Sequence, residues 1–148
     1  PEASKLKPAN SYDAQFSVQY LTAVSLVRGR FGLAEIEPEA ITDGDVLALT
    51  SKVKYGAYKD DEFPKLFHGE VIITMDDGKK LSHREHVNRG AADRPLTNAE
   101  IIAKFRDNAA TAVNPDAIER MQASMLGIDK AQHGGEVLSA FSPAARAA

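Results

Sequence analysis

The segment that most constrains the fold of this chain is a long apolar stretch over residues 13–30, DAQFSVQYLTAVSLVRGR. Two neighbouring stripes appear in it at about 100° per residue: Phe16, Tyr20, Ala23, Val24 and Val27 in the first, and Ala14, Val18 and Leu21 in the second. Together they cover a wider arc than a surface helix needs. The pattern therefore predicts one central helix between two layers, capped by Ser11 or Asp13 and ended by Gly29 with Gly32.

The composition restricts the classes of protein to which the chain can belong. Its 148 residues, 43% apolar and 26% charged, suit one globular domain with a core. A net charge of -3 and the lack of any basic run argue against a nucleic-acid partner. The chain has no cysteine, which excludes disulfides and thiolate metal sites and suits a reducing, cytoplasmic compartment. It shows no membrane span and no signal peptide. It begins Pro-Glu without a methionine, so we expect a missing upstream segment.

A β-hairpin is predicted over residues 70–87. Two alternating runs flank Asp76-Asp77-Gly78, and Asp-Gly between such runs is a strong hairpin signal. Val71, Ile73 and Met75 are expected on one face. Residues 52–58, KVKYGAY, also alternate and predict a further strand.

Helices are expected on both sides of these strands. A short one is predicted over residues 44–50, and one from Thr97 to about Ala112 opens with a Thr97–Glu100 capping box. Two more follow, one from Asn114-Pro115 to Gly127 and a short one near Val137. The order predicts an α+β fold with a small antiparallel sheet packed with helices. Three strands make a thin sheet, so we expect another from upstream of Pro1 or from a partner.

Most clusters of reactive residues have simple structural explanations. His83 and His86 have HxxH spacing, but they fall on opposite faces of a strand, so His83 is expected beside Glu85 and a metal site is not predicted. The acidic residues 60–62 lack the spacing of a calcium loop, and Asp76-Asp77 belongs to a turn.

Tyr20 is the remaining candidate for chemistry, and two interpretations of it are open. It is either a packed tyrosine whose hydroxyl bonds to a backbone carbonyl, or a phenol that faces a cleft as a donor or proton relay. Ser17, one turn earlier on the same side of the helix, is a weaker candidate.

Four stretches, in this order, resemble the C-terminal portion of the MmgE/PrpD family. Residues 12–26 resemble its A-x-F-S-x-x-Y helix, residues 46–55 its short helix that leads into a strand, and residues 69–87 its hairpin with an Asp-Gly turn. The fourth stretch resembles its G…PL[ST]…E…KF motif, with Gly90, Pro95, Leu96, Thr97, Glu100, Lys104 and Phe105. The similarity extends over residues 8–126.

This resemblance implies a two-domain enzyme. Residues 1–113 would form most of an α+β lid whose first strand is missing, and residues 114–148 would be helices that pack on an absent helical domain. The family's helix tyrosine maps onto Tyr20, with Ser17 the weaker site residue. The aspartate, histidine and lysine of the helical domain have no counterparts here, so the chain alone is expected to be inactive.

The resemblance also implies a reaction. We expect a cofactor-independent hydro-lyase, without a metal, that acts on a small polycarboxylate similar to 2-methylcitrate. An epimerase or isomerase and a decarboxylase of the same family are the alternatives. The expected partners are the N-terminal helical domain and a second copy in a homodimer. A stand-alone binding or oligomerisation module is the non-enzymatic alternative.

Overall fold

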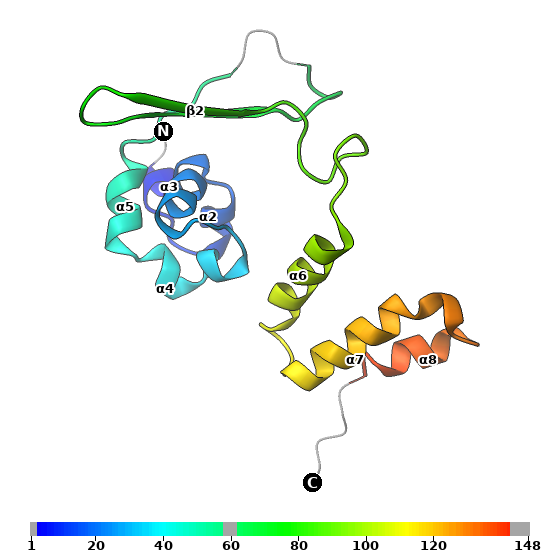
Figure 1. The fold of residues 1–148 in the computed structure, drawn as a ribbon. Coiled ribbons are helices and arrows are strands. Elements are labelled where there is room, and N and C mark those ends of the chain that lie inside the picture. Colours follow the sequence, from blue (N-terminus) through cyan, green and yellow to red (C-terminus); the bar gives the residue numbers. More distant parts are fainter. Residues whose placement is uncertain (1–2, 58–61, 143–148) are drawn as a thin grey trace. The chain divides into compact units, whose positions relative to one another are not determined.

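The computed structural model describes residues 3–57 and 62–142 (Figure 1). The chain divides into two compact units. Unit 1 comprises Pro1–Glu62 and unit 2 comprises Phe63–Ala148. The boundary that the sequence predicts after residue 113 stays a prediction. In the structure, the helices on either side of that point contact each other within unit 2.

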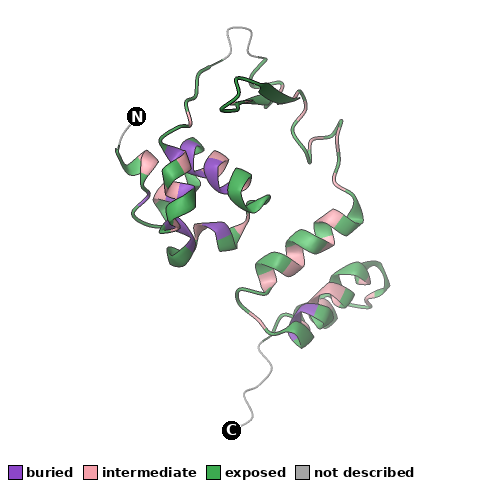
Figure 2. Cartoon of the chain, turned by 60° about the vertical axis from the view of Figure 1, so that its left-hand side comes forward, coloured by how far each residue is buried: buried purple, intermediate pink, exposed green. Residues whose placement is uncertain are grey.

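Unit 1 is helical and has its own small core (Figure 2). Its longest helix, α3, contacts α5, and buried side chains of both elements belong to one cluster. The core consists of Ala14, Tyr20, Ala23, Val24, Ile41 and Val46. The elements of the unit are α1 (Ala3–Leu6), α2 (Ser11–Gln15), α3 (Val18–Arg28), η1 (Leu33–Ile36), α4 (Pro38–Ile41) and α5 (Gly44–Thr50). The helix predicted over residues 44–50 is therefore confirmed.

The single helix predicted over residues 13–30 is wrong, because the chain breaks it at Ser17. Ser17 has extended backbone angles and accepts a hydrogen bond from the amide of Tyr20, so it is the N-cap of α3. The preceding helix, α2, is capped by Asn10 rather than by Ser11 or Asp13. Gly29 ends α3 at a φ of 69°, as predicted, since glycine enters the left-handed region without strain.

The apolar arc of this segment is covered on only one side within unit 1. Tyr20, Ala23 and Val24 are buried against the core, whereas Phe16 is 59% exposed and Val18 is also exposed. Gln19, which belongs to neither apolar stripe, is buried. The break at Ser17 changes the direction of the chain, so the two stripes do not share one helix axis. The prediction of two covering layers is not met in unit 1.

Two side-chain hydroxyls attach α1 to the rest of unit 1. The Ser17 hydroxyl donates to the carbonyl of Lys5, and the Thr50 hydroxyl donates to the carbonyl of Leu6 at 2.7 Å. Both hydroxyl-bearing residues are buried. Elements α1, α3 and α5 are therefore linked by side-chain contacts to main-chain atoms.

Unit 2 begins with the hairpin. Strands β1 (Gly69–Thr74) and β2 (Lys80–Glu85) pair antiparallel, with Val71 opposite His83 and Ile73 opposite Leu81. Gly78 has a φ of 83° in the turn, which explains why glycine is used there. The hairpin prediction is confirmed in position and in its Asp-Gly turn.

The rest of unit 2 is helical and follows the predicted helix signals closely. Thr97 and Glu100 form the expected capping box at the start of α6 (Asn98–Ala109). Asn114 caps α7 (Pro115–Leu126), which contacts α6, η2 (Ile128–Lys130) and α8 (Gly134–Ser139). Arg94 pairs with Glu85 and Arg89 with Glu100, so ion pairs link the loop after the hairpin to β2 and to α6.

The further strand predicted over residues 52–58 is not formed, because residues 53–57 lie outside any strand and Tyr58 lies outside the described residues. Alternation alone does not make a strand without a neighbour that satisfies its backbone groups. The described part of the chain therefore has a two-stranded sheet.

The chain is an α+β protein, as predicted. Among residues 3–57 and 62–142, no helix combines the length and the apolarity that crossing a bilayer requires.

Candidate functional site

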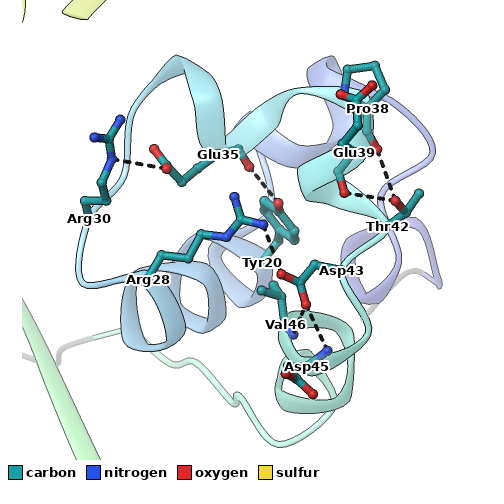
Figure 3. A network of polar contacts seen from close by, with 10 residues as sticks. All are labelled: Tyr20, Arg28, Arg30, Glu35, Pro38, Glu39, Thr42, Asp43, Asp45 and Val46. Carbon is teal, nitrogen blue, oxygen red and sulfur yellow. Dashed lines mark hydrogen bonds and ion pairs between the residues drawn. The ribbon is translucent and has the colours of Figure 1, made fainter.

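Tyr20 lies in the core of unit 1, at the centre of a group of polar contacts (Figure 3). Its side chain is 0% exposed, and its hydroxyl donates to the main-chain carbonyl of Glu35 at 2.6 Å. Burial raises the pKa of the Tyr20 phenol above its ordinary value. The phenol is therefore protonated at neutral pH and can act as a donor but not as a base.

Ser17 and Tyr20 are neighbours, but their hydroxyls serve different segments. The Ser17 oxygen accepts from the backbone amide of Tyr20 at 3.0 Å and donates to the carbonyl of Lys5. The Tyr20 hydroxyl instead bonds to η1. Each hydroxyl has a packing role of its own, which is the first of the two interpretations left open above. The catalytic roles of Tyr20 and Ser17 stay predictions.

Glu35 provides a second contact that holds the same segment. Its side chain is only 5% exposed, and its Oε1 lies 3.1 Å from Nε of Arg30. Its Oε2 is buried without a hydrogen-bond partner among the described residues. A Cβ at Gly32 would lie 3.4 Å from this oxygen, so glycine leaves room for the carboxylate. The carbonyl of Glu35 thus joins η1 to α3, and its carboxylate joins η1 to Arg30 in the segment after α3.

Arg28 and Asp43 form an ion pair close to Tyr20 (Figure 3). Nη2 of Arg28 lies 2.9 Å from Oδ2 of Asp43, and the other carboxylate oxygen accepts from the amides of Asp45 and Val46 at the start of α5. The hydrogen bond from Arg28 and those amides hold the pKa of Asp43 below its ordinary value, and the same bond raises the pKa of Arg28. Asp43 therefore joins the end of α3 to the first turn of α5.

We expect Asp43→Asn to remove an acid-sensitive part of the stability of unit 1. The folded-state pKa of Asp43 is lowered, so its ionised form stabilises the fold above the unfolded-state value of 3.8, and that contribution is lost as the pH falls through the folded-state pKa. Asparagine keeps the helix cap but not the charge. Urea midpoints of the chain at pH 6 and pH 3 should differ less in the variant than in the wild type.

Asp45→Asn is the matched control for this experiment. Asp45 lies in the same helical turn and makes no ion pair with the described residues. Its variant should keep the pH response of the wild type. An unchanged pH response in Asp43→Asn would show that the Arg28 pair contributes nothing to acid sensitivity.

Elsewhere, the candidate residues of unit 2 have structural partners. Nε2 of His83 lies 2.9 Å from Oε1 of Glu85, as the strand geometry predicted. In the described ranges, no three His, Asp or Glu residues come together to hold a metal ion. Asp60 and Asp61 lie outside the described residues.

A hollow of about 220 Å³ beside α7 is lined by Ala123, Ser124, Gly127, Lys130, Ala131, Glu136 and Val137.

Sequence reasoning missed the charged residues around Tyr20. Glu35 lies 15 residues after Tyr20 in an acidic connector, and nothing in the local pattern marks it as buried. Asp43 could have been found, because an aspartate before a predicted helix is a common N-cap. Its ion pair with Arg28 joins residues 15 positions apart in the sequence. Periodicity within one helix cannot predict a contact over such a separation.

Comparison with known proteins identifies the family of this chain. The model of the MmgE/PrpD C-terminal domain matches residues 2–129. A cis-aconitate decarboxylase-like protein of Aspergillus oryzae is 25% identical over 143 residues, covering 95% of this chain and 29% of that protein. The cis-aconitate decarboxylases of Homo sapiens and Mus musculus are 27% and 28% identical over 116 residues, 77% of this chain and 24% of each relative. The chain spans about a quarter of the length of these curated relatives. It belongs to the MmgE/PrpD family and corresponds to the C-terminal domain of that family.

Proposed function

We propose that this chain is the C-terminal domain of a longer lyase that acts on a small polycarboxylate. The observation that carries the proposal is the family match over residues 2–129, together with relatives named as cis-aconitate decarboxylases. The identities of 25% to 28% support the class of reaction better than one particular substrate. A cytoplasmic location, a homodimer and an adjoining helical domain stay predictions.

Decarboxylation of cis-aconitate is the reaction that the names of the relatives favour. Dehydration of a 2-methylcitrate-like substrate is the second candidate, and it rests on the resemblance of the four sequence stretches to a family that includes 2-methylcitrate dehydratase. Both reactions pass through negative charge on a carbon next to a carboxylate. Such charge is stabilised by hydrogen-bond donors that are held in place before the reaction.

The contribution of this chain would be to close and shape the site. A domain that covers bound substrate excludes water and completes the set of residues around the reacting carbon. Unit 1 is suited to this because its polar contacts fix η1 and α5 to α3, so the unit can move as one body. Tyr20 is the residue of the chain to which the resemblance assigns a direct part as a general acid or an orienting donor.

Proton NMR of the complete enzyme in deuterated water would test the proposal. With cis-aconitate, we expect a product with new vinylic protons and one carboxylate fewer, together with release of carbon dioxide. With 2-methylcitrate, a methyl-alkene signal without carbon dioxide would identify the dehydratase instead. Deuterium uptake next to a carboxylate, without an alkene product, would indicate an epimerase. No change in any of these substrates would contradict the proposed lyase.

A further inference from the structure

We propose that the ion pair between Arg30 and Glu35 is a latch, which a carboxylate of the substrate opens by binding Arg30. Opening the latch releases η1 and uncovers the hydroxyl of Tyr20. The inference deepens the proposed function and rests on it, because it requires a substrate with carboxylates. The contacts that carry it meet at Glu35, which lies between Arg30 and Tyr20 (Figure 3).

Glu35 joins Arg30 to Tyr20 through two different groups. Its main-chain carbonyl accepts from the Tyr20 hydroxyl at 2.6 Å, and its Oε1 lies 3.1 Å from Nε of Arg30. Both acceptors belong to one residue of η1, so a movement of η1 away from α3 breaks both contacts together. The contact made by Arg30 is therefore coupled to the burial of the phenol.

The Glu35 carboxylate relies on Arg30 for its pairing. The side chain is 5% exposed, and Oε2 has no hydrogen-bond partner among the described residues. A buried carboxylate is stable only when it is paired or hydrogen-bonded. If another anion takes Arg30, the carboxylate is stabilised by moving into water. Because Glu35 lies in η1, that movement lifts η1.

Little apolar packing holds η1 in place. Leu33 and Ala34 are exposed, and Ile36 is only partly buried against the core. Neither η1 nor the following α4 has a side-chain hydrogen bond at its N-cap. Segments with few buried apolar contacts open at a low cost in free energy. We therefore expect η1 to open while the rest of unit 1 stays folded.

Arg30 is accessible to an anion in solution. Its side chain is 57% exposed, and its two Nη atoms make no hydrogen bond with the described residues. A guanidinium binds a carboxylate through two parallel N–H groups along one edge. A carboxylate that takes the edge containing Nε displaces Glu35, because Nε makes the present contact. A polycarboxylate can supply this group, so its binding favours the open state of η1.

The neighbouring pair of Arg28 and Asp43 lacks this property. The carboxylate of Asp43 is 27% exposed and also accepts from the amides of Asp45 and Val46. Loss of Arg28 would leave Asp43 with these donors and with water. Arg28 therefore offers a matched control, an arginine of the same unit whose partner does not depend on it.

Acetylation of tyrosine by N-acetylimidazole tests the latch in the complete enzyme without substrate. The reagent transfers its acetyl group to an accessible phenol and releases imidazole, so the rate at Tyr20, read by tandem mass spectrometry, follows the open fraction of η1. Arg30→Gln should raise this rate about 10-fold or more, because a buried charged group loses its partner. An ordinary exposed ion pair would change it less than about 5-fold. A change that small would overturn the inference.

Two further variants separate the latch from a general loosening of unit 1. Arg30→Lys keeps a cation beside Glu35 and should restore most of the protection of Tyr20. Arg28→Gln should leave the rate at Tyr20 close to that of the wild type. Equal increases in Arg28→Gln and Arg30→Gln would overturn the inference.

Hydrogen exchange at the Glu35 amide tests the opening by an anion. This amide donates to the carbonyl of Gly32 within the closed segment. The probe is tricarballylate, a tricarboxylate without a hydroxyl group or a double bond, compared with potassium chloride at equal ionic strength. Ligands usually slow exchange by stabilising the folded state. Here we expect exchange about 5-fold faster or more in the wild type and no such increase in Arg30→Gln. Unchanged or slower exchange in the wild type would overturn the inference.

Turnover of the unmodified enzyme is measured separately. An enzyme without turnover whose Tyr20 is uncovered by Arg30→Gln and whose η1 responds to tricarballylate would refute the proposed reaction and leave the latch standing. An active enzyme whose Tyr20 stays protected in Arg30→Gln would refute the latch alone.

Discussion

The 148-residue chain alone is expected to give no turnover of cis-aconitate or 2-methylcitrate, with a rate lower than that of the complete enzyme by about 10⁴-fold or more, the upper end of what one positioned acid or base contributes. The two buried ionisable groups of unit 1, Tyr20 and Glu35, each have a partner within the unit. The Tyr20 hydroxyl is bound to the Glu35 carbonyl, and the Glu35 carboxylate lies against Arg30. The resemblance places the other acid and base residues in the helical domain.

The measurement compares the two proteins at equal molar concentration in the NMR assay. Circular dichroism of the short chain serves as the control for folding, because an unfolded chain would be inactive for a trivial reason. Product formation by the folded short chain would show that its own residues carry the chemistry, and the two-domain proposal would then be wrong.

Replacement of Tyr20 is expected to destabilise unit 1 more than any other single change discussed. Tyr20→Ala removes a fully buried aromatic ring and should lower the free energy of unfolding by about 3–5 kcal/mol, as for other large-to-small changes. Tyr20→Phe keeps the ring but leaves the Glu35 carbonyl without its donor. The expected cost is about 1–3 kcal/mol, the usual range for a buried group left unsatisfied. Urea unfolding of the chain measures both.

Tyr20→Phe also separates the two interpretations of this residue. If the phenol acts in catalysis, kcat of the complete enzyme should fall on the order of 10²-fold. If its role is packing alone, kcat should change little once measured where the variant is folded. Tyr12→Phe is the matched control, because Tyr12 is 68% exposed and lies in α2. A Tyr20→Phe enzyme with wild-type stability would contradict the structural role described above.

Local signals in the sequence predicted most elements of the fold. The Asp-Gly turn determined the hairpin, and the Thr97–Glu100 box and Asn114-Pro115 determined the starts of α6 and α7. Each of these signals acts over four residues or fewer, so neighbouring residues suffice to specify it. The family resemblance, which rests on four such stretches, is confirmed by the match over residues 2–129.

Features that depend on distant parts of the chain could not be predicted in this way. Ser17 suits a helix interior or an N-cap equally well by pattern, and its contact with Lys5 favours the cap. The alternation of residues 52–58 says nothing about whether a neighbouring strand is present. The helical pattern places Tyr20 on the buried side, but its contact with Glu35 depends on how η1 folds back onto α3. Periodicity predicts which side of a helix is buried. It does not predict which atom accepts the hydrogen bond of a buried tyrosine hydroxyl.

The attachment of the first turn has a consequence for sequence variation in this domain. Ser17 and Thr50 hold Lys5 and Leu6 by their carbonyl oxygens, which every amino acid possesses. These two hydrogen bonds therefore make no demand on the side chains of residues 5 and 6 while they fix the position of α1. The constraint falls instead on the two hydroxyl-bearing residues, far along the chain from the segment that they hold. Related domains can thus differ in this lead-in segment and still join it to the helices at the same place.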